Sequence, residues 1–160
     1  MKRTLITLMS CAALSLPLSL SAAEHGEHQM AMEGNANASM EMMEHDSIML
    51  GQQTVEGVNG MAHLNDVGAV MAKMGKEENY HFMMMFSDAK TGEALHEGTV
   101  AVKITGPGDT QAGAAIPLMG MGGHFGADVA LLKKGEYHFM VGTKLSDGQK
   151  RPFEFSYTVQ

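Results

Sequence analysis

The chain has 160 residues, with 18 acidic and 11 basic side chains and a formal net charge of −7 at pH 7. An acidic chain without a stripe of basic residues is a poor partner for nucleic acid or for an anionic membrane surface. Its composition is unusual in holding 17 Met and 8 His but no Trp. Cys11 is the single cysteine. If the residues before 24 are removed, thiol catalysis, cysteine-based zinc sites and iron–sulfur clusters are therefore excluded.

The first 23 residues have the pattern of an export signal peptide. Two basic residues start the chain, Leu5–Leu20 is mostly apolar, and Ser21-Ala22-Ala23 offers the small residues of a cleavage site. We therefore expect a periplasmic protein whose mature chain starts near Glu24 and does not span the membrane. The alternative is a lipoprotein anchored through Cys11, although the apolar run continues past that residue.

Residues 24–47 form a Met/His-rich segment without β-branched or aromatic residues and without a sustained period. This composition predicts a disordered N-terminal tail. Its candidate ligands are His25, His28, Met30, Met32, Met40, Met42, Met43 and His45. Such a segment is typical of copper-scavenging tails, and a solvated linker with chance Met enrichment is the alternative.

Residues 48–160 are expected to form one domain in which strand patterns dominate. The predicted strands are Val55–Leu64, Tyr80–Phe86, Thr99–Thr105, Ala114–Met119, Gly126–Leu132, Tyr137–Leu145 and Pro152–Val159. Short strands separated by turns about every 8–12 residues predict an all-β fold, an immunoglobulin-like antiparallel β-sandwich.

One short helix is expected near the start of this sandwich. Val67, Val70, Met71 and Met74 recur at helical spacing, with Asn65 or Asp66 before them as an N-cap and Gly75 after them as a stop. Such a helix could also cover one face of the strand that follows it. A further pattern is that Tyr80-His81-Phe82-Met83 is echoed by Tyr137-His138-Phe139-Met140, which indicates equivalent positions in the sandwich.

Three of the predicted strands carry a His and a Met two residues apart on the face that should be polar. Side chains alternate along a strand, so residues i and i+2 share a face about 6.5–7 Å apart. The aromatic residues and Met84 of Tyr80–Phe86 take the core face. The opposite faces carry His81, Met83 and Met85 on that strand, His138 and Met140 on Tyr137–Val141, and Met61 and His63 on Val58–Leu64.

These residues suit a soft metal ion. Thioether sulfur favours Cu(I), and imidazole binds copper in either oxidation state, so a copper ion is predicted, with Cu(I) favoured over Cu(II). We expect His81, Met83, Met85, His138 and Met140 as the first ligands, and Met61 and His63 as further ones. The alternative is that Met fills the core and that each His is a hydrogen-bonded structural residue.

A second candidate site is the glycine-rich segment that holds Met119, Met121 and His124. Glycines at 120, 122, 123 and 126 allow a tight backbone turn, which leaves these side chains free to converge. The alternative is a hairpin whose Met residues fill the end of the core. His96 is expected to be an ordinary surface residue.

The sequence lacks a phosphate loop, Gly-x-Ser-x-Gly, His-Glu-x-x-His and an EF-hand pattern, so we expect no enzyme activity. The predicted function is copper delivery, buffering or tolerance, with a periplasmic or inner-membrane metal donor or acceptor as protein partner. One alternative is a non-catalytic immunoglobulin-like accessory module of an envelope complex, with the Met-rich face as its contact surface. Another is a methionine sink for oxidants.

Between Tyr80 and Val159 the chain resembles the YtkA-like and FixH-like exported domains. The shared motifs are Met119-Gly120-Met121-Gly122, Gly135-Glu136-Tyr137 and the alternating Arg151-Pro152-Phe153-Glu154-Phe155. The resemblance implies an immunoglobulin-like sandwich associated with copper handling or oxidase assembly. The Met/His enrichment is also similar to that of CopC-type periplasmic copper carriers. CopC-type carriers bind Cu(II) through a His at the first position of the mature chain, whereas Glu24 would come first here. The resemblance therefore implies Cu(I) binding by Met-rich segments.

Overall fold

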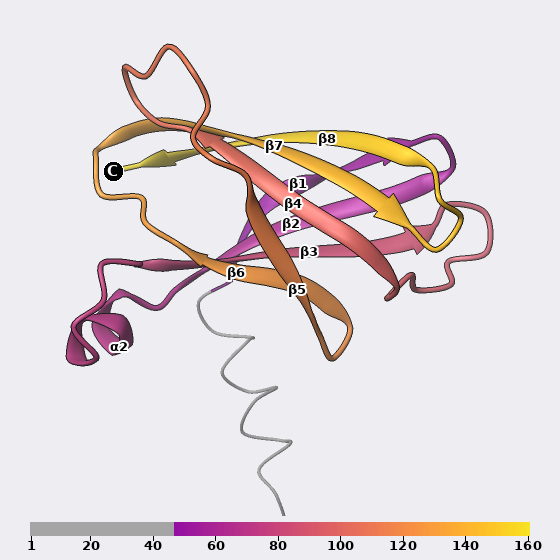
Figure 1. Cartoon of the computed structure of the whole chain (residues 1–160), viewed down its shortest axis with the longest axis horizontal. Helices are drawn as coiled ribbons and strands as arrows, with labels where there is room; N and C mark the ends of the chain where they lie inside the picture. Colours follow the sequence, from indigo (N-terminus) through magenta and orange to yellow (C-terminus); the bar gives the residue numbers. More distant parts are fainter. Residues whose placement is uncertain (1–46) are drawn as a thin grey trace, which may run out of the picture. The chain divides into compact units, whose positions relative to one another are not determined.

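The computed structural model describes residues 47–160, which form antiparallel strands in two packed layers and one short helix (Figure 1). The elements are β1 (Ser47–Val55), β2 (Val58–Asp66), α2 (Gly68–Lys73), β3 (Tyr80–Asp88), β4 (Gly98–Thr105), β5 (Ile116–Met121), β6 (His124–Val129), β7 (Gly135–Leu145) and β8 (Lys150–Val159). The predicted all-β fold with one short helix is confirmed. The predicted signal peptide and all but the last residue of the predicted tail lie outside the described residues.

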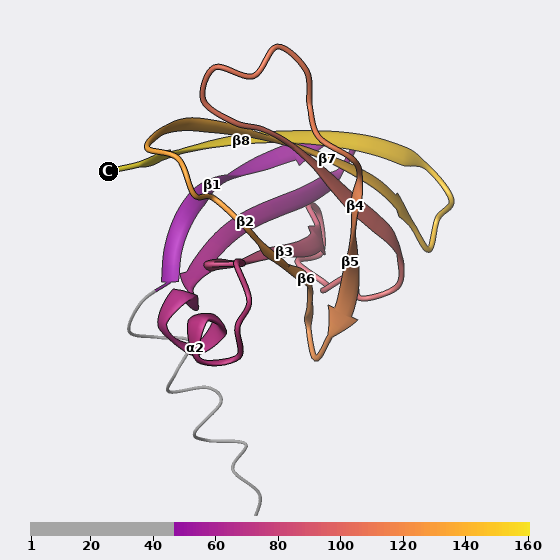
Figure 2. The same ribbon diagram turned by 60° about the vertical axis from the view of Figure 1, so that its left-hand side comes forward.

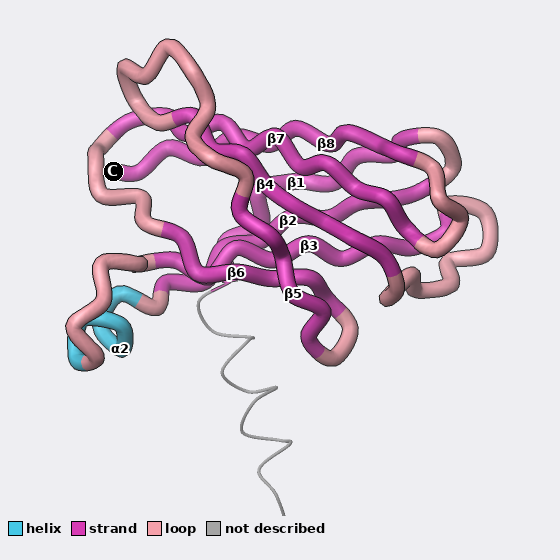
Figure 3. Tube along the Cα trace, in the orientation of Figure 1, coloured by secondary structure: helices cyan, strands magenta, loops and turns pink. Residues whose placement is uncertain are grey.

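The strands follow one another in the order β1-β2-β3-β6-β5-β4-β7-β8, and every neighbouring pair is antiparallel. One layer contains β1, β2, β3 and β6, and the other contains β4, β7 and β8 (Figure 3). Strand β5 connects them, because its first half pairs with β4 and its second half with β6. At the opposite edge, the Gln53 side-chain amide exchanges two hydrogen bonds with the backbone of Glu154, which holds β1 against β8.

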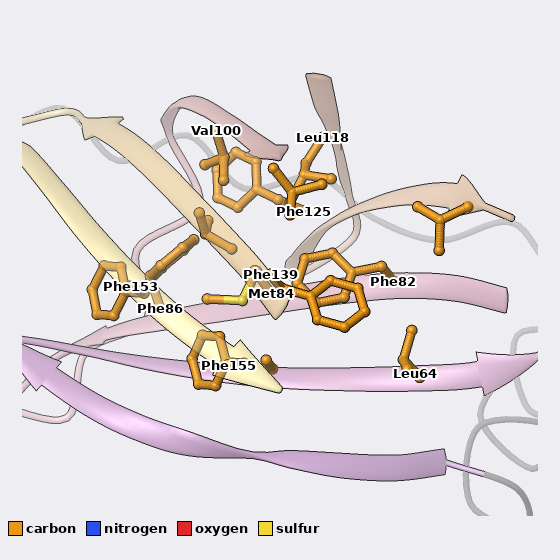
Figure 4. Packing of buried hydrophobic residues seen from close by; sticks show 14 of the residues in the cluster. Leu64, Phe82, Met84, Phe86, Val100, Leu118, Phe125, Phe139, Phe153 and Phe155 are labelled. Atoms are coloured by element: carbon orange, nitrogen blue, oxygen red, sulfur yellow. The ribbon is translucent and has the colours of Figure 1, made fainter. Parts of the chain in front are cut away.

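Aromatic side chains from both layers fill the core between them (Figure 4). The rings of Phe82 on β3 and Phe139 on β7 are stacked with centroids 5.0 Å apart and planes 11° from parallel. Phe86 packs against Phe125 and Phe153. The two Tyr-His-Phe-Met segments therefore do occupy facing positions, one in each layer.

The end of the sandwich is closed by Arg151, whose side chain is only 4% exposed. Its guanidinium donates two hydrogen bonds to the Asp147 carboxylate, at 3.1 and 2.6 Å. Its Nε lies 3.9 Å from Glu56 Oε2 in the β1–β2 turn. A buried charge must be paired with opposite charges. Because Asp147 and Glu56 lie in turns of different layers, their pairing with Arg151 joins the two layers.

The start of the domain differs from the prediction. The expected strand Val55–Leu64 is broken by a two-residue turn at Glu56 and Gly57, which both have positive φ (45° and 78°), as tight hairpins require. The strand before that turn, β1, was missed because a register shift between Met49 and Gly51 interrupts its alternation.

The helix is found where it was expected, although it starts later. Val67 occupies the N-cap position without a side-chain hydrogen bond, while Asp66 Oδ1 accepts a hydrogen bond from the Gly68 amide at 2.9 Å. Gly75 follows the helix with φ +70°. The helix lies beyond the ends of β2 and β3 (Figure 2). No helix among residues 47–160 is long and apolar enough to cross a membrane.

Replacing Phe139 tests the packing between the two layers. Phe139→Ala removes the ring that stacks on Phe82, and we expect it to lower the free energy of unfolding by about 3–5 kcal/mol. Met140→Ala, at the exposed neighbouring position on the same strand, should change it by less than about 0.5 kcal/mol. Urea unfolding followed by circular dichroism measures both, and equal losses would contradict the assigned core.

Candidate metal centre

His and Met side chains form rows across the outer face of the layer that contains β2, β3 and β6. The central row crosses five strands and is made of Met49, His63, Met83, Gly126 and Met119. On one side of it lies the row Asn65, His81 and Asp128, and on the other the pair Met61 and Met85. His124 and Met121 form a further cross-strand pair in the β5–β6 hairpin. Five strands, β1, β2, β3, β5 and β6, thus bring their histidines and thioethers to one face.

Gly126 makes room for an imidazole in the middle of this face. A Cβ at this position would lie 2.5 Å from His81 Nε2 and 3.3 Å from His124 Cδ2. The ring of His81 therefore occupies the space above Gly126, with the ring of His124 beside it. The two ring centroids are 6.0 Å apart and the planes are perpendicular. Any side chain at position 126 would displace His81.

His81 is held in this place by a carboxylate. Its Nδ1 lies 2.7 Å from Asp128 Oδ1 on the neighbouring strand. When Nδ1–H donates to this carboxylate, Nε2 keeps its lone pair and faces the space above Gly126. A carboxylate that orients a ring in this way is the usual partner of a metal-binding histidine.

Two further imidazole nitrogens on this face are buried without a partner. Nε2 of His63 and Nε2 of His124 have no hydrogen-bond partner among the described residues. His63 Nδ1 lies 3.1 Å from Ser47 Oγ. Burial lowers the pKa of His63, and burial together with the neighbouring His81 lowers the pKa of His124. Both rings are therefore biased toward the neutral form, which is the form that binds a metal.

Met83 lies between these histidines in the central row. It pairs with His63 on one side and with Gly126 on the other. Although it belongs to the outer face, it is only 5% exposed. No three His, Cys, Asp or Glu side chains between residues 47 and 160 converge closely enough to hold a metal ion by themselves. A metal here needs the Met83 thioether as a ligand, or a side-chain rotation that brings the imidazoles together.

Most of the residues predicted as metal ligands share this face. They are Met61, His63, His81, Met83, Met85, Met119, Met121 and His124. The glycine-rich segment forms a hairpin in which only Gly122 and Gly123 are turn residues, so Met121 and His124 belong to strands. His96 is exposed, as expected.

His138 and Met140, which were expected among the first ligands, are not brought to this face, and their role as ligands stays a prediction. They lie on β7 in the other layer, where His138 pairs with Thr105 and Ser156. Because Phe139 between them points into the core toward Phe82, their outer face points away from that of β3. Alternation showed correctly that both residues face outward, but it could not show on which layer.

The structure adds three residues that the sequence interpretation missed. Gly126 and Asp128 follow His124 at intervals of two residues on β6. Because side chains alternate along a strand, this spacing would have placed all three residues on one face. Met49 was missed together with its strand.

Comparison with known proteins shows where this fold occurs. The chain is similar to a copper-bound variant of FetP from uropathogenic Escherichia coli strain F11, with a TM-score of 0.53 and 14% identity over 71% of this chain and 96% of that one. It is also similar to the PmoD soluble domain from Methylocystis sp. ATCC 49242 (Rockwell), with a TM-score of 0.42 and 13% identity over 68% and 96% of the two chains.

No protein-family model and no curated protein matches the sequence. At 14% identity the likeness to FetP shows a shared fold. The resemblance to YtkA-like, FixH-like and CopC-type proteins stays a prediction.

The lowered pKa values of His63 and His124 predict a loss of stability in mild acid. Their folded-state pKa lies below the ordinary value of 6.5, so the unfolded chain binds protons first. The stabilisation is complete above pH 6.5 and is lost as pH falls through the lowered values. Thermal melts of the metal-free protein should therefore show a steeper fall in Tm between pH 7.5 and 5.5 than melts of His63→Gln/His124→Gln.

Met140→Leu, at an exposed position on the other layer, is the control and should keep the pH slope of the unaltered protein. Parallel slopes for the double variant and the unaltered protein would contradict the assignment.

Proposed function

We propose that this chain is an exported, periplasmic copper-binding protein that holds the ion on the outer face of β2, β3 and β6. The ligands are Met83 and the Nε2 atoms of His63, His81 and His124, which rotation of the histidine side chains brings together around the ion. The observation that carries the proposal is a buried thioether flanked by imidazoles, two of which have a buried nitrogen without a hydrogen-bond partner among residues 47–160. Leaving such nitrogens unpaired costs free energy, and a bound metal ion removes that cost.

The chemistry of the donors favours copper. Imidazole and thioether are borderline and soft ligands, whereas Ca²⁺ and Mg²⁺ require oxygen ligands. The Asp128 carboxylate contacts His81 Nδ1, so it orients this ligand and does not bind the ion itself. Cu(I) is favoured because it accepts thioether sulfur readily and needs no counter-charge from carboxylates. The fold shared with a copper-bound protein supports the same ion.

The role that fits these donors is copper delivery, buffering or tolerance without turnover. Met119 and Met121 are exposed at the rim of the site, on the β5–β6 hairpin. Flexible thioethers at a rim can take up a soft ion and pass it inward or outward by ligand exchange. The protein partner is therefore a copper donor or acceptor that docks at this hairpin.

Anaerobic Cu(I) titration against a chromophoric competitor tests the site. His63→Gln/His124→Gln should weaken the tightest binding event at least tenfold, which corresponds to about 1.4 kcal/mol. His138→Gln/Met140→Leu, on the other layer, should leave it unchanged. Residues 24–46 are present in every variant, so differences report on the sheet alone. Equal affinities of the two double variants would overturn the proposed site.

Gly126→Ala provides a second arm of this titration that keeps every ligand. The added Cβ would lie 2.5 Å from His81 Nε2, so the ring must move and affinity should fall. Gly142→Ala is the matched control, because its Cβ meets nothing within 4 Å on the outer face of β7. Equal affinities of these two variants would likewise overturn the site.

A further inference from the structure

A separate hollow lies on the same outer face, between Met61 on β2 and Met85 on β3. Its volume is about 200 Å³, and its wall includes both thioethers, Asn59, Ser87 and Gly123. Met61 and Met85 are direct cross-strand partners, so their Cβ atoms are about 4.5–5.5 Å apart and their side chains can reach one ion. The proposed copper site of His63, His81, Met83 and His124 is called the histidine centre below. None of these four residues lines the hollow.

Within residues 47–160, the wall of the hollow carries no formal charge. It consists of Met, Phe, Ala and Gly side chains with the neutral polar groups of Gln52, Asn59 and Ser87. A divalent cation would enter without a compensating carboxylate, which is costly away from bulk water. A monovalent soft cation loses less hydration free energy and gains two sulfur ligands. The wall therefore favours monovalent over divalent cations, and soft over hard cations.

A third ligand is available at the edge of the hollow. Gly123 lines it, and a Cβ on Gly123 would lie 3.9 Å from His96 Cε1. The imidazole of His96 thus stands next to the opening while remaining exposed to solvent. An exposed His is free to turn toward an ion in the hollow.

We propose that this hollow is a second metal site, specific for a monovalent soft cation such as Cu(I) or Ag(I), with Met61 and Met85 as ligands and His96 as the third. It shares no ligand with the histidine centre. Met83 and Met85 are two residues apart on one strand, about 6.5–7 Å, so an ion can pass between the sites by exchange of neighbouring thioethers.

Nuclear magnetic resonance of the whole chain, labelled with ¹³C at the methionine methyl groups, tests this site directly. Ag(I) serves as the probe because it is monovalent, soft and diamagnetic. The methyl signals of Met61 and Met85 should shift on Ag(I) addition, and they should still shift in His63→Gln/His124→Gln. Zn(II) should leave them in place. Signals that do not move with Ag(I), or that move only when the histidine centre is intact, would overturn the second site.

Counting bound Ag(I) gives an independent measurement. Met61→Leu/Met85→Leu should lose one equivalent and His96→Gln should weaken that equivalent, while the matched variant Met140→Leu should lose none. Leu preserves the volume of Met, and a thermal melt verifies that the fold is retained. Loss of the histidine-centre copper in Met61→Leu/Met85→Leu would show one shared site and overturn the proposal. If His63→Gln/His124→Gln loses a bound ion but keeps the equivalent that Met61 and Met85 hold, the two sites are separate, as proposed.

Discussion

The stacking of Phe82 on Phe139 is the contact on which the outer face of the sheet depends. It fixes the side of β3 that faces the core and therefore directs His81, Met83 and Met85 outward. A slip of one residue in this strand would exchange the two faces and bury the imidazole. The aromatic residues of the core are not ligands themselves. They contribute to the site because they fix the register of β3 and so the direction in which its ligands point.

The outer face then presents two kinds of potential metal ligands on neighbouring rows. Around Gly126, the imidazoles of His63, His81 and His124 share the outer face with the buried Met83 thioether. The pKa values of His63 and His124 are lowered, chiefly by burial, and the Asp128 carboxylate orients the ring of His81. Between Met61 and Met85, thioethers line an uncharged hollow. Protons compete with metal at the first kind of site but not at thioether sulfur. If copper is bound as we propose, acidification would therefore favour the methionines over the histidines.

Sequence patterns predicted the faces of individual strands, because alternation is a local property. Met61 and His63 were predicted to share the outer face of their strand, and the residues of its other face, Val58, Ala62 and Leu64, are buried. Which strands are neighbours depends on contacts distant in sequence, such as β3 with β6, and alternation carries no information about them. For that reason the sequence could not show that His138 and Met140 lie on the other layer, or that Asp128 contacts His81.

In the proposed site, copper is bound by imidazole and the Met83 thioether together. X-ray absorption spectroscopy of the whole chain, loaded with less than one equivalent of Cu(I), reports on both kinds of ligand at once. We expect a mixed shell of imidazole nitrogen and sulfur around copper. Met83→Leu should remove sulfur from this shell, and His63→Gln/His124→Gln should reduce the imidazole scattering. A shell of sulfur alone, or of nitrogen and oxygen without sulfur, would contradict it.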